Sequence, residues 1–295
     1  MEKNNMIIQI TITTIFSILC AIVVYPFLLL VGISLSNEMD VATYGYRLIP
    51  KNIDFSAYMY IFKNPSTILN AYKVTIFFSI VGTVLSVILI SMIAYPLSKK
   101  GLRGRNAITF YLYFTMLFNG GMVSTYILVT QYLHLRNSIW VYILPSLISP
   151  WFVFMVRTFF QGLPSEIAES AKIDGASEYD IFFRFILPLS KPVLATIALM
   201  TFLSKWNLWY ESMLYINNDE LISLQYLLQR IMQNIQMLQD ASKNTAVTSM
   251  LSAYKIPAET VRMAMAVIVA GPVIVIFPFF QKYFVKGLTV GGVKG

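Results

Sequence analysis

The stretch AESAKIDGASEYDIFFRFILP, residues Ala168–Pro188, lies between two long apolar runs and combines charged side chains with a central glycine, Gly175. Ser165 is typical of a helix start, and Gly175 of a left-handed helix stop. Ser177 and Asp180 then form an S-x-x-D capping pattern, which predicts a second helical turn. We therefore expect two short helices joined at Gly175.

The composition around this stretch is that of a membrane protein. Hydrophobic residues make up 57% and charged residues 12% of the 295 positions, whereas soluble domains usually carry about twice that charged fraction. A helix needs roughly 20 apolar residues to span a bilayer. Runs of that kind predict an all-α membrane protein with a single membrane domain, residues 1–295, and six transmembrane helices, at approximately 7–35, 73–98, 107–133, 137–158, 190–210 and 262–284.

The fifth span is the weakest of the six, because Lys191 and Lys205 lie close together in it. It fits if Lys191 lies at one interface and Lys205 extends along the apolar surface towards the other. The orientation follows from the loop SKKGLRGR, residues 98–105, which is rich in Lys and Arg. Basic loops next to spans stay in the cytoplasm, so we expect both termini and a loop at 160–188 inside, with loops 36–72 and 211–261 outside.

The residue types missing from the spans exclude several function classes. The five clean apolar runs hold no Asp, Glu, Lys or Arg, which disfavours an ion-coupled transporter and a membrane-embedded enzyme. One cysteine, Cys20, and one histidine, His134, leave no intrachain disulfide and no metal site. The chain also lacks a G-x-x-x-x-G-K-[ST] phosphate loop. We expect transport of an uncharged solute, driven by a partner.

The helix before Gly175 has two faces. Ile167, Ala168 and Ala171 form a small apolar face, and charged side chains border it. Such a helix fits a groove on another protein. An ordinary solvated helix at the membrane interface has the same periodicity, so the pattern alone leaves both interpretations open.

The spacing of this stretch resembles the EAA loop of ABC importer permeases. Glu169, Ala171, Gly175 and the pair Leu187-Pro188 match five of its seven fixed positions, while Ser170 and Phe185 replace an alanine and an isoleucine. Other segments resemble the carbohydrate-uptake branch that includes the maltose-type permeases, and within it the oligosaccharide and complex-glycan subgroup. They are AYPLSKKGLRGRN (94–106), FNGGMVSTYILV (118–129), KWNLWYESMLYI (205–216) and FFQKYFVKGLTVGGVKG (279–295).

The resemblance implies a type I ABC importer fold in a bacterial cell membrane. In that family two homologous permeases form a heterodimer around one path, two ATPase subunits bind ATP and Mg, and an extracellular solute-binding lipoprotein delivers the sugar. This chain would then be a non-catalytic subunit without a cofactor, surrounded by membrane lipid and not bound to nucleic acid. A permease for another small polar solute, an amino acid or a phosphonate, is the alternative.

The resemblance also implies the residues that couple the permease to its ATPase. Glu169 should meet a basic group, Ala171 should allow close approach, and Gly175 should make the turn that Asp174 braces. The full set expected to serve this coupling is Glu166, Glu169, Ala171, Asp174, Gly175, Leu187 and Pro188.

The candidates for the substrate path lie at the outer end of the fifth span. Trp206, Asn207 and Tyr210 combine aromatic faces with an amide, which suits stacking on sugar rings and bonding to hydroxyls. Asn119, beside the pair Gly120-Gly121, is a further candidate. An interfacial belt of aromatic residues would have the same composition.

The outer segment Asp219–Leu238 carries apolar residues at helical spacing, so we expect an amphipathic helix there. Packing against the membrane domain and contact with a docked binding protein are both compatible with it.

Overall fold

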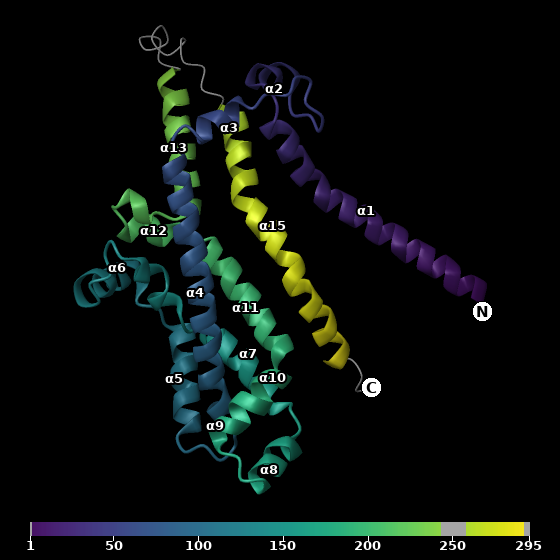
Figure 1. The fold of residues 1–295 in the computed structure, drawn as a ribbon, viewed down its shortest axis with the longest axis vertical. Coiled ribbons are helices and arrows are strands. Elements are labelled where there is room, and N and C mark those ends of the chain that lie inside the picture. The colour runs from purple at the N-terminus through teal and green to yellow at the C-terminus, as the bar shows by residue number, and fades with distance from the viewer. Residues whose placement is uncertain (1, 243–257, 292–295) are drawn as a thin grey trace. The chain divides into compact units, whose positions relative to one another are not determined.

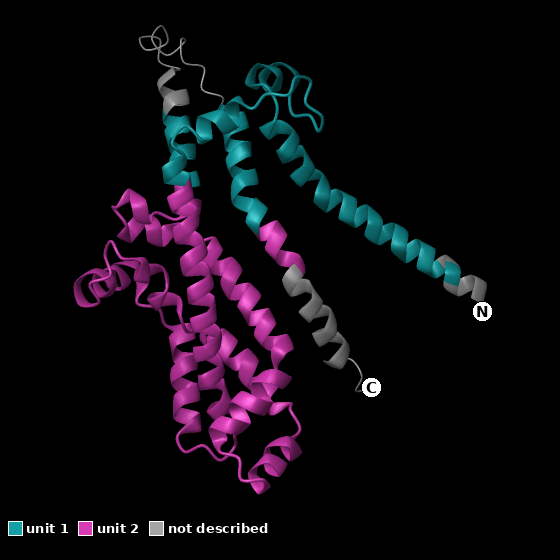
Figure 2. Ribbon diagram, viewed as in Figure 1, with its two compact units in different colours: residues 1–68, 228–272 teal, residues 69–227, 273–295 magenta. Residues whose placement is uncertain are grey.

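The computed structural model describes residues 2–242 and 258–291, and within these ranges the regular structure is helical apart from one isolated bridge, Ser36 to Ile53. The chain divides into two compact units, residues 1–68 with 228–272 and residues 69–227 with 273–295 (Figure 2). The side chains of residues 279–295, and of residues 238–257 in the predicted outer loop 211–261, are outside the described set.

Three helices are long and apolar enough to cross a membrane (Figure 1). They are α1 (Glu2–Ser34), α4 (Pro65–Ser98) and α15 (Ala258–Gly291). Three further candidates consist of two helical segments with a bend between them, of 114°, 51° and 77°. The described residues thus hold three spans, or up to six if each bent pair is one span.

The segment predicted as one span at 107–133 is bent by 114°. It consists of α5 (Arg105–Leu117), α6 (Gly121–Ile127) and the π-helical η1 (Leu128–Tyr132). Gly121 has a φ of +79°, which glycine adopts without strain, and its N–H donates to the Asn119 side chain at 2.8 Å. The Asn119–Gly121 segment therefore turns the chain in a new direction, and the membrane span at 107–133 stays a prediction, with this bend inside it.

The fourth and fifth candidates are bent in the same way. The fourth joins the short helices η2 (Ile139–Tyr142) and η3 (Leu144–Ser146) to α7 (Pro150–Gln161). The fifth runs from α9 (Glu178–Asp180) through η4 (Ile181–Ile186) and α10 (Leu187–Leu189) into α11 (Lys191–Trp206). Prolines lie in the first turns of α7 and α11, where the missing N–H costs no helical bond.

In unit 1, a carboxylate from one segment caps a distant helix. Glu38, in the first turn of α2 (Glu38–Tyr44), accepts hydrogen bonds from the Glu259 and Thr260 backbone N–H groups, each at 3.0 Å, and from the Thr260 hydroxyl at 2.8 Å. These N–H groups belong to the first turn of α15, where an anion also favours the helix dipole. The short helix α3 (Ser56–Ile61) completes this unit's described loop.

Unit 2 has its apolar core where α4, α7, η4 and α11 meet. Ile90 and Leu97 of α4 pack with Val156 of α7, Ile181 of η4 and Ile197 of α11. All five side chains are buried. This core packs the stretch Ala168–Pro188 against α4, α7 and α11.

Lys205 does not extend towards an interface as predicted. Its side chain is 2% exposed, and Nζ donates to the Ser146 hydroxyl at 2.9 Å and to the Tyr142 carbonyl at 3.4 Å. A Cβ at Gly82 would lie 2.6 Å from Lys205 Cε, so any larger residue there would require the Lys205 side chain to shift. Buried polar groups require such partners, and neutral oxygens from the fourth span supply them here.

The predicted outer helix begins later than expected. The segment Asp219–Leu221 is a 3₁₀ turn, η5, and α13 runs over Leu224–Ser242. Ser223 caps α13, because its hydroxyl accepts from Tyr226 N at 3.2 Å. The periodicity located the helix, whereas the cap decided its first residue.

Candidate functional site

The first helix of the coupling stretch is α8 (Ser165–Ile173), and it ends as predicted at a left-handed glycine. Gly175 has a φ of +82°. Its N–H donates to the Lys172 carbonyl at 3.0 Å, and the Ala176 N–H donates to the Ala171 carbonyl at 2.9 Å. These two bonds form a Schellman motif. Asp174 is the C-cap residue of α8; its bracing role stays a prediction.

The second helix also begins as predicted. The Asp180 N–H donates to the Ser177 hydroxyl at 3.2 Å, and the Ser177 N–H donates to Asp180 Oδ2 at 3.3 Å. This reciprocal pair is a capping box. It opens a continuous segment of α9 (Glu178–Asp180), π-helical η4 (Ile181–Ile186) and α10 (Leu187–Leu189).

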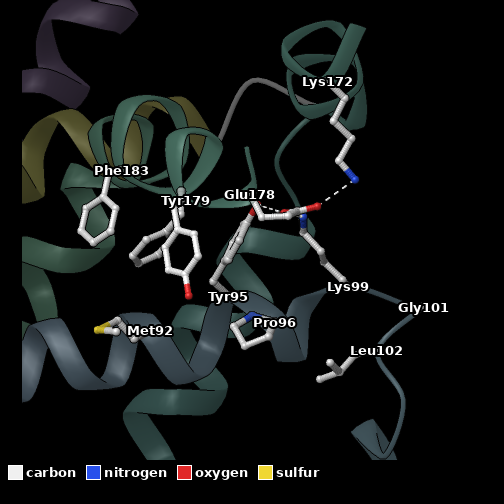
Figure 3. A pocket seen from close by; sticks show the side chains of 11 residues that line it. Met92, Tyr95, Pro96, Lys99, Gly101, Leu102, Lys172, Glu178, Tyr179 and Phe183 are labelled. Atoms are coloured by element: carbon white, nitrogen blue, oxygen red, sulfur yellow. Dashed lines mark hydrogen bonds and ion pairs between the residues drawn. The ribbon is translucent and has the colours of Figure 1, made fainter. Parts of the chain in front are cut away.

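Glu178 joins three segments of unit 2 (Figure 3). Its carboxylate accepts hydrogen bonds from Lys172 of α8 at 2.8 Å, from the Tyr95 hydroxyl of α4 at 2.9 Å, and from Lys99. Glu178 lies in the loop predicted at 160–188, before the predicted span 190–210. The bonds from Lys172 and then Lys99 lower the pKa of this carboxyl to about 2.

Sequence reasoning missed Glu178. Tyr95 lies 83 residues and Lys99 79 residues before it, and no local pattern relates positions so far apart. Its nearest clue was the capping pattern, which placed Glu178 in a first helical turn but gave it no partner.

The expected coupling residues separate into exposed and buried groups. Glu166, Glu169 and Pro188 are exposed, whereas Ala171 is 5% exposed and packs in the core of unit 2. Leu187 is partly buried against the same core. An apolar side chain that the sequence did not single out, Ile173, is 87% exposed on α8. The exposed groups of this helix therefore include Glu166, Glu169 and Ile173, while Ala171 packs in the core.

A second site lies at the other end of unit 2, where Figure 1 shows α6 and α12 (Tyr210–Tyr215). A hollow of about 290 Å³ is lined there by Asn119, Tyr210, Glu211 and Tyr215, among others. The structure thus brings together two residues predicted for the substrate path, Asn119 and Tyr210. The Tyr210 hydroxyl donates to Met122 Sδ at 2.7 Å across 88 residues of sequence.

Glu211 gives this hollow an available acceptor. Its Oε2 atom is buried and has no hydrogen-bond partner within the described residues. Burial raises the pKa of this carboxyl, and the positive charge of Lys205 opposes that rise. A buried acceptor without a donor is costly, so a hydroxyl-bearing ligand would satisfy it. The sequence search missed Glu211 because it looked for aromatic and amide groups.

The other two path candidates lie elsewhere. Trp206 is 1% exposed and stacks on Phe202 with ring centroids 5.8 Å apart, so its side chain does not line the hollow. Asn207 is exposed at the end of α11 and bonds Gln225 Nε2 at 2.9 Å. Within the described ranges no three His, Cys, Asp or Glu side chains could hold a metal ion.

Comparison with known proteins extends the likeness over almost the whole chain. Residues 6–290 match the family described as binding-protein-dependent transport system inner membrane component. The protein LplC of Bacillus subtilis (strain 168) is 39% identical, over 93% of this chain and 90% of that protein. The polygalacturonan/rhamnogalacturonan transport system permease protein YtcP of the same organism is 37% identical, over 95% of this chain and 94% of that protein.

Two further relatives show the same pattern. The arabinooligosaccharides transport system permease protein AraQ of Bacillus subtilis (strain 168) is 32% identical, over 97% of this chain and 96% of that protein. A chain from the crystal structure of a bacterial ABC transporter involved in the import of the acidic polysaccharide alginate superposes with a TM-score of 0.78. It is 30% identical, and the match covers 95% of this chain and 98% of that chain.

Proposed function

Because this chain belongs to the family of binding-protein-dependent transport system inner membrane components, we propose that it carries a sugar or oligosaccharide across the membrane as the permease subunit of an ATP-driven ABC importer. Relatives that match along almost their whole length are named for polygalacturonan/rhamnogalacturonan and arabinooligosaccharide transport. These names favour a sugar over the amino acid and phosphonate alternatives. In this proposal the subunit forms part of the translocation path, and a partner ATPase subunit hydrolyses ATP.

The observation that carries the coupling role is the way in which α8 is held and presented. Ala171 anchors it in the core, the Gly175 turn ends it, and Glu178 ties Lys172 to α4. Glu166, Glu169 and Ile173 remain on the outer surface. A helix that is packed on one face and exposed on the other can transmit the movement of a partner whose groove binds the exposed face. We assign that groove to the ATPase.

The substrate path is assigned to the hollow between α6 and α12. Tyr210 and Tyr215 offer aromatic faces, Asn119 an amide, and Glu211 a carboxylate oxygen in need of a donor. These groups are the kinds that hold sugar rings and their hydroxyls. Trp206 and Asn207 would act there only through the neighbouring backbone, since Trp206 packs inward and Asn207 bonds Gln225.

The remaining partners follow from the family. The proposal includes a second homologous permease, two ATPase subunits that hold ATP and Mg, and an extracellular solute-binding lipoprotein. The loop that contains Lys99, Lys100, Arg103 and Arg105 is expected in the cytoplasm, because basic loops next to spans stay there. Both termini then lie on the cytoplasmic side of a bacterial cell membrane.

The test is sugar-dependent ATPase activity of the complete complex, reconstituted in lipid with its binding protein. We expect sugar-loaded binding protein to stimulate hydrolysis, and Glu169→Ala to reduce that stimulation. The matched control is Glu220→Ala, which removes an exposed glutamate far along the chain, in the outer loop. Stimulation by amino acids but not by sugars would contradict the substrate class. Equal activity of Glu169→Ala and Glu220→Ala would contradict the coupling role.

A further inference from the structure

A cavity whose wall includes Lys99, Lys172 and Glu178 is not part of the proposed substrate path. It measures about 740 Å³ and lies between the C-terminal end of α4, the loop that follows, and the segment from Glu178 to Phe183. Figure 3 shows its wall, with Met92 and Phe183 at one end and Lys99 and Lys172 towards the other.

The two ends of this cavity differ in chemistry. Met92 is 47% and Phe183 53% exposed, so the apolar end is open to its surroundings. The other end carries the ammonium groups of Lys99 and Lys172. Met92 and Lys99 are seven residues apart on and just after α4, which corresponds to about 10 Å along a helix. The wall therefore changes from apolar to cationic over about 10 Å.

The charge of the cavity is also unbalanced. Two ammonium groups share one carboxylate, that of Glu178, so the wall keeps a surplus positive charge. Lys99 in addition lies over the Tyr95 ring at 4.5 Å from its centroid. An occupant with an apolar part and one negative charge complements this surface.

The position of the cavity defines the source of such an occupant. The candidate span α4 ends at Ser98, so Lys99 lies at the boundary of the apolar layer. Basic pockets at such a boundary attract the headgroups of anionic lipids. We propose that this cavity binds an anionic phospholipid, with the acyl chain against Met92 and Phe183 and the phosphate against Lys99 and Lys172. This inference requires the chain to be in a membrane but does not depend on which solute it carries.

The test uses the complete transporter in lipid discs of phosphatidylcholine. The probe is phosphatidylglycerol with a photoreactive group in its acyl chain, and peptide mass spectrometry locates the adducts. We expect labelling of the peptides that contain Met92 and Phe183, several-fold above labelling by the same probe with a phosphatidylcholine headgroup. Lys99→Gln and Lys172→Gln should each lower it several-fold.

Two variants separate a lipid site from a structural cluster. Glu178→Gln removes the carboxylate that competes with the lipid phosphate, so it should raise the labelling. If the three side chains only hold the fold together, Lys99→Gln, Lys172→Gln and Glu178→Gln should all lower the labelling. Lys100→Gln removes an adjacent exposed charge that does not line the cavity, and should leave the labelling unchanged. The proposal is overturned by equal labelling with both headgroups, by an equal effect of Lys100→Gln, or by cavity peptides that stay unlabelled while span peptides react. The last result would mean that a protein partner covers the cavity.

Discussion

Lys172 Nζ lies 2.8 Å from Glu178 Oε1, and this ion pair joins α8 to α9 across the turn at Gly175. The same carboxylate accepts a hydrogen bond from Tyr95 of α4. One carboxylate therefore links α8 to α4, in addition to the backbone of the turn. In our proposal, in which α8 is the coupling helix, this link connects it to a candidate span.

Replacing Glu178 with glutamine should weaken that connection. The neutral amide cannot pair with Lys172 and Lys99, so we expect sugar-stimulated ATPase activity to fall several-fold while membrane insertion stays normal. The measurement is ATPase rate with and without loaded binding protein, and Glu220→Gln in the outer loop is the matched control. Wild-type stimulation in Glu178→Gln would show that α8 is coupled through the backbone alone.

Glu178 should also make thermal stability depend on pH. Its pKa is lowered from 4.5 to about 2 in the folded chain, so the folded state favours the ionised form. The stabilisation is complete above about pH 4.5 and is lost as the pH falls towards 2. Because the side chain is 51% exposed, solvent screening limits the effect to about 1 kcal/mol or less. The difference in Tm between wild type and Glu178→Gln should shrink over this acid range, and a constant difference would argue against the ion pairs.

Substitutions at Gly175 should act through the backbone. A Cβ there would meet no atom of the described residues within 4 Å, but the φ of +82° disfavours other residues, by about 1–2 kcal/mol. Asparagine tolerates this conformation better than alanine. We expect coupled ATPase activity to decrease in the order Gly175→Asn, Gly175→Ala, Gly175→Asp, since aspartate adds a charge. Equal activities in the three variants would mean that the left-handed turn at residue 175 is not required for coupling.

Gly82→Ala should destabilise unit 2. Its Cβ would lie 2.6 Å from Lys205 Cε, so Lys205 would have to leave its bond to Ser146. Overpacking of this kind costs about 1–3 kcal/mol, seen as a lower Tm. Gly271→Ala in α15 is the control, because no atom of the described residues lies within 4 Å of a Cβ at this position.

The double variant Gly82→Ala, Lys205→Ala tests the cause. If the clash is the reason, it should be more stable than the sum of the two single changes predicts. Additive losses would show that Gly82 matters for another reason.

Alanine substitutions at Trp206 and Tyr210 should affect different properties, stability at Trp206 and sugar uptake at Tyr210. Trp206 is 1% exposed, and loss of a buried tryptophan costs about 3–5 kcal/mol, so we expect a lower Tm and less folded protein. Tyr210 lines the outer hollow, so Tyr210→Ala should reduce sugar uptake with a Tm near that of wild type. Normal uptake by Tyr210→Ala, or a stable Trp206→Ala, would contradict this division.

Local patterns were enough for the elements that the chain forms by itself. The left-handed stop at Gly175 and the capping box of Ser177 and Asp180 involve residues within five positions of one another, and the sequence predicted both. The long apolar runs located α1, α4 and α15 because bilayer thickness demands their length. The motif spacing around Glu169 likewise identified the family without any coordinates.

Only the tertiary structure decided which distant groups meet. Glu178 receives Tyr95, Lys205 is enclosed over Gly82, and Tyr210 meets Met122 beside Asn119. The bend at Gly121 turned one predicted span into two segments. Periodicity tells which face of a helix is apolar, but not which other helix covers it. Burial and ion pairing depend on that second choice, and the packing of the whole chain makes it.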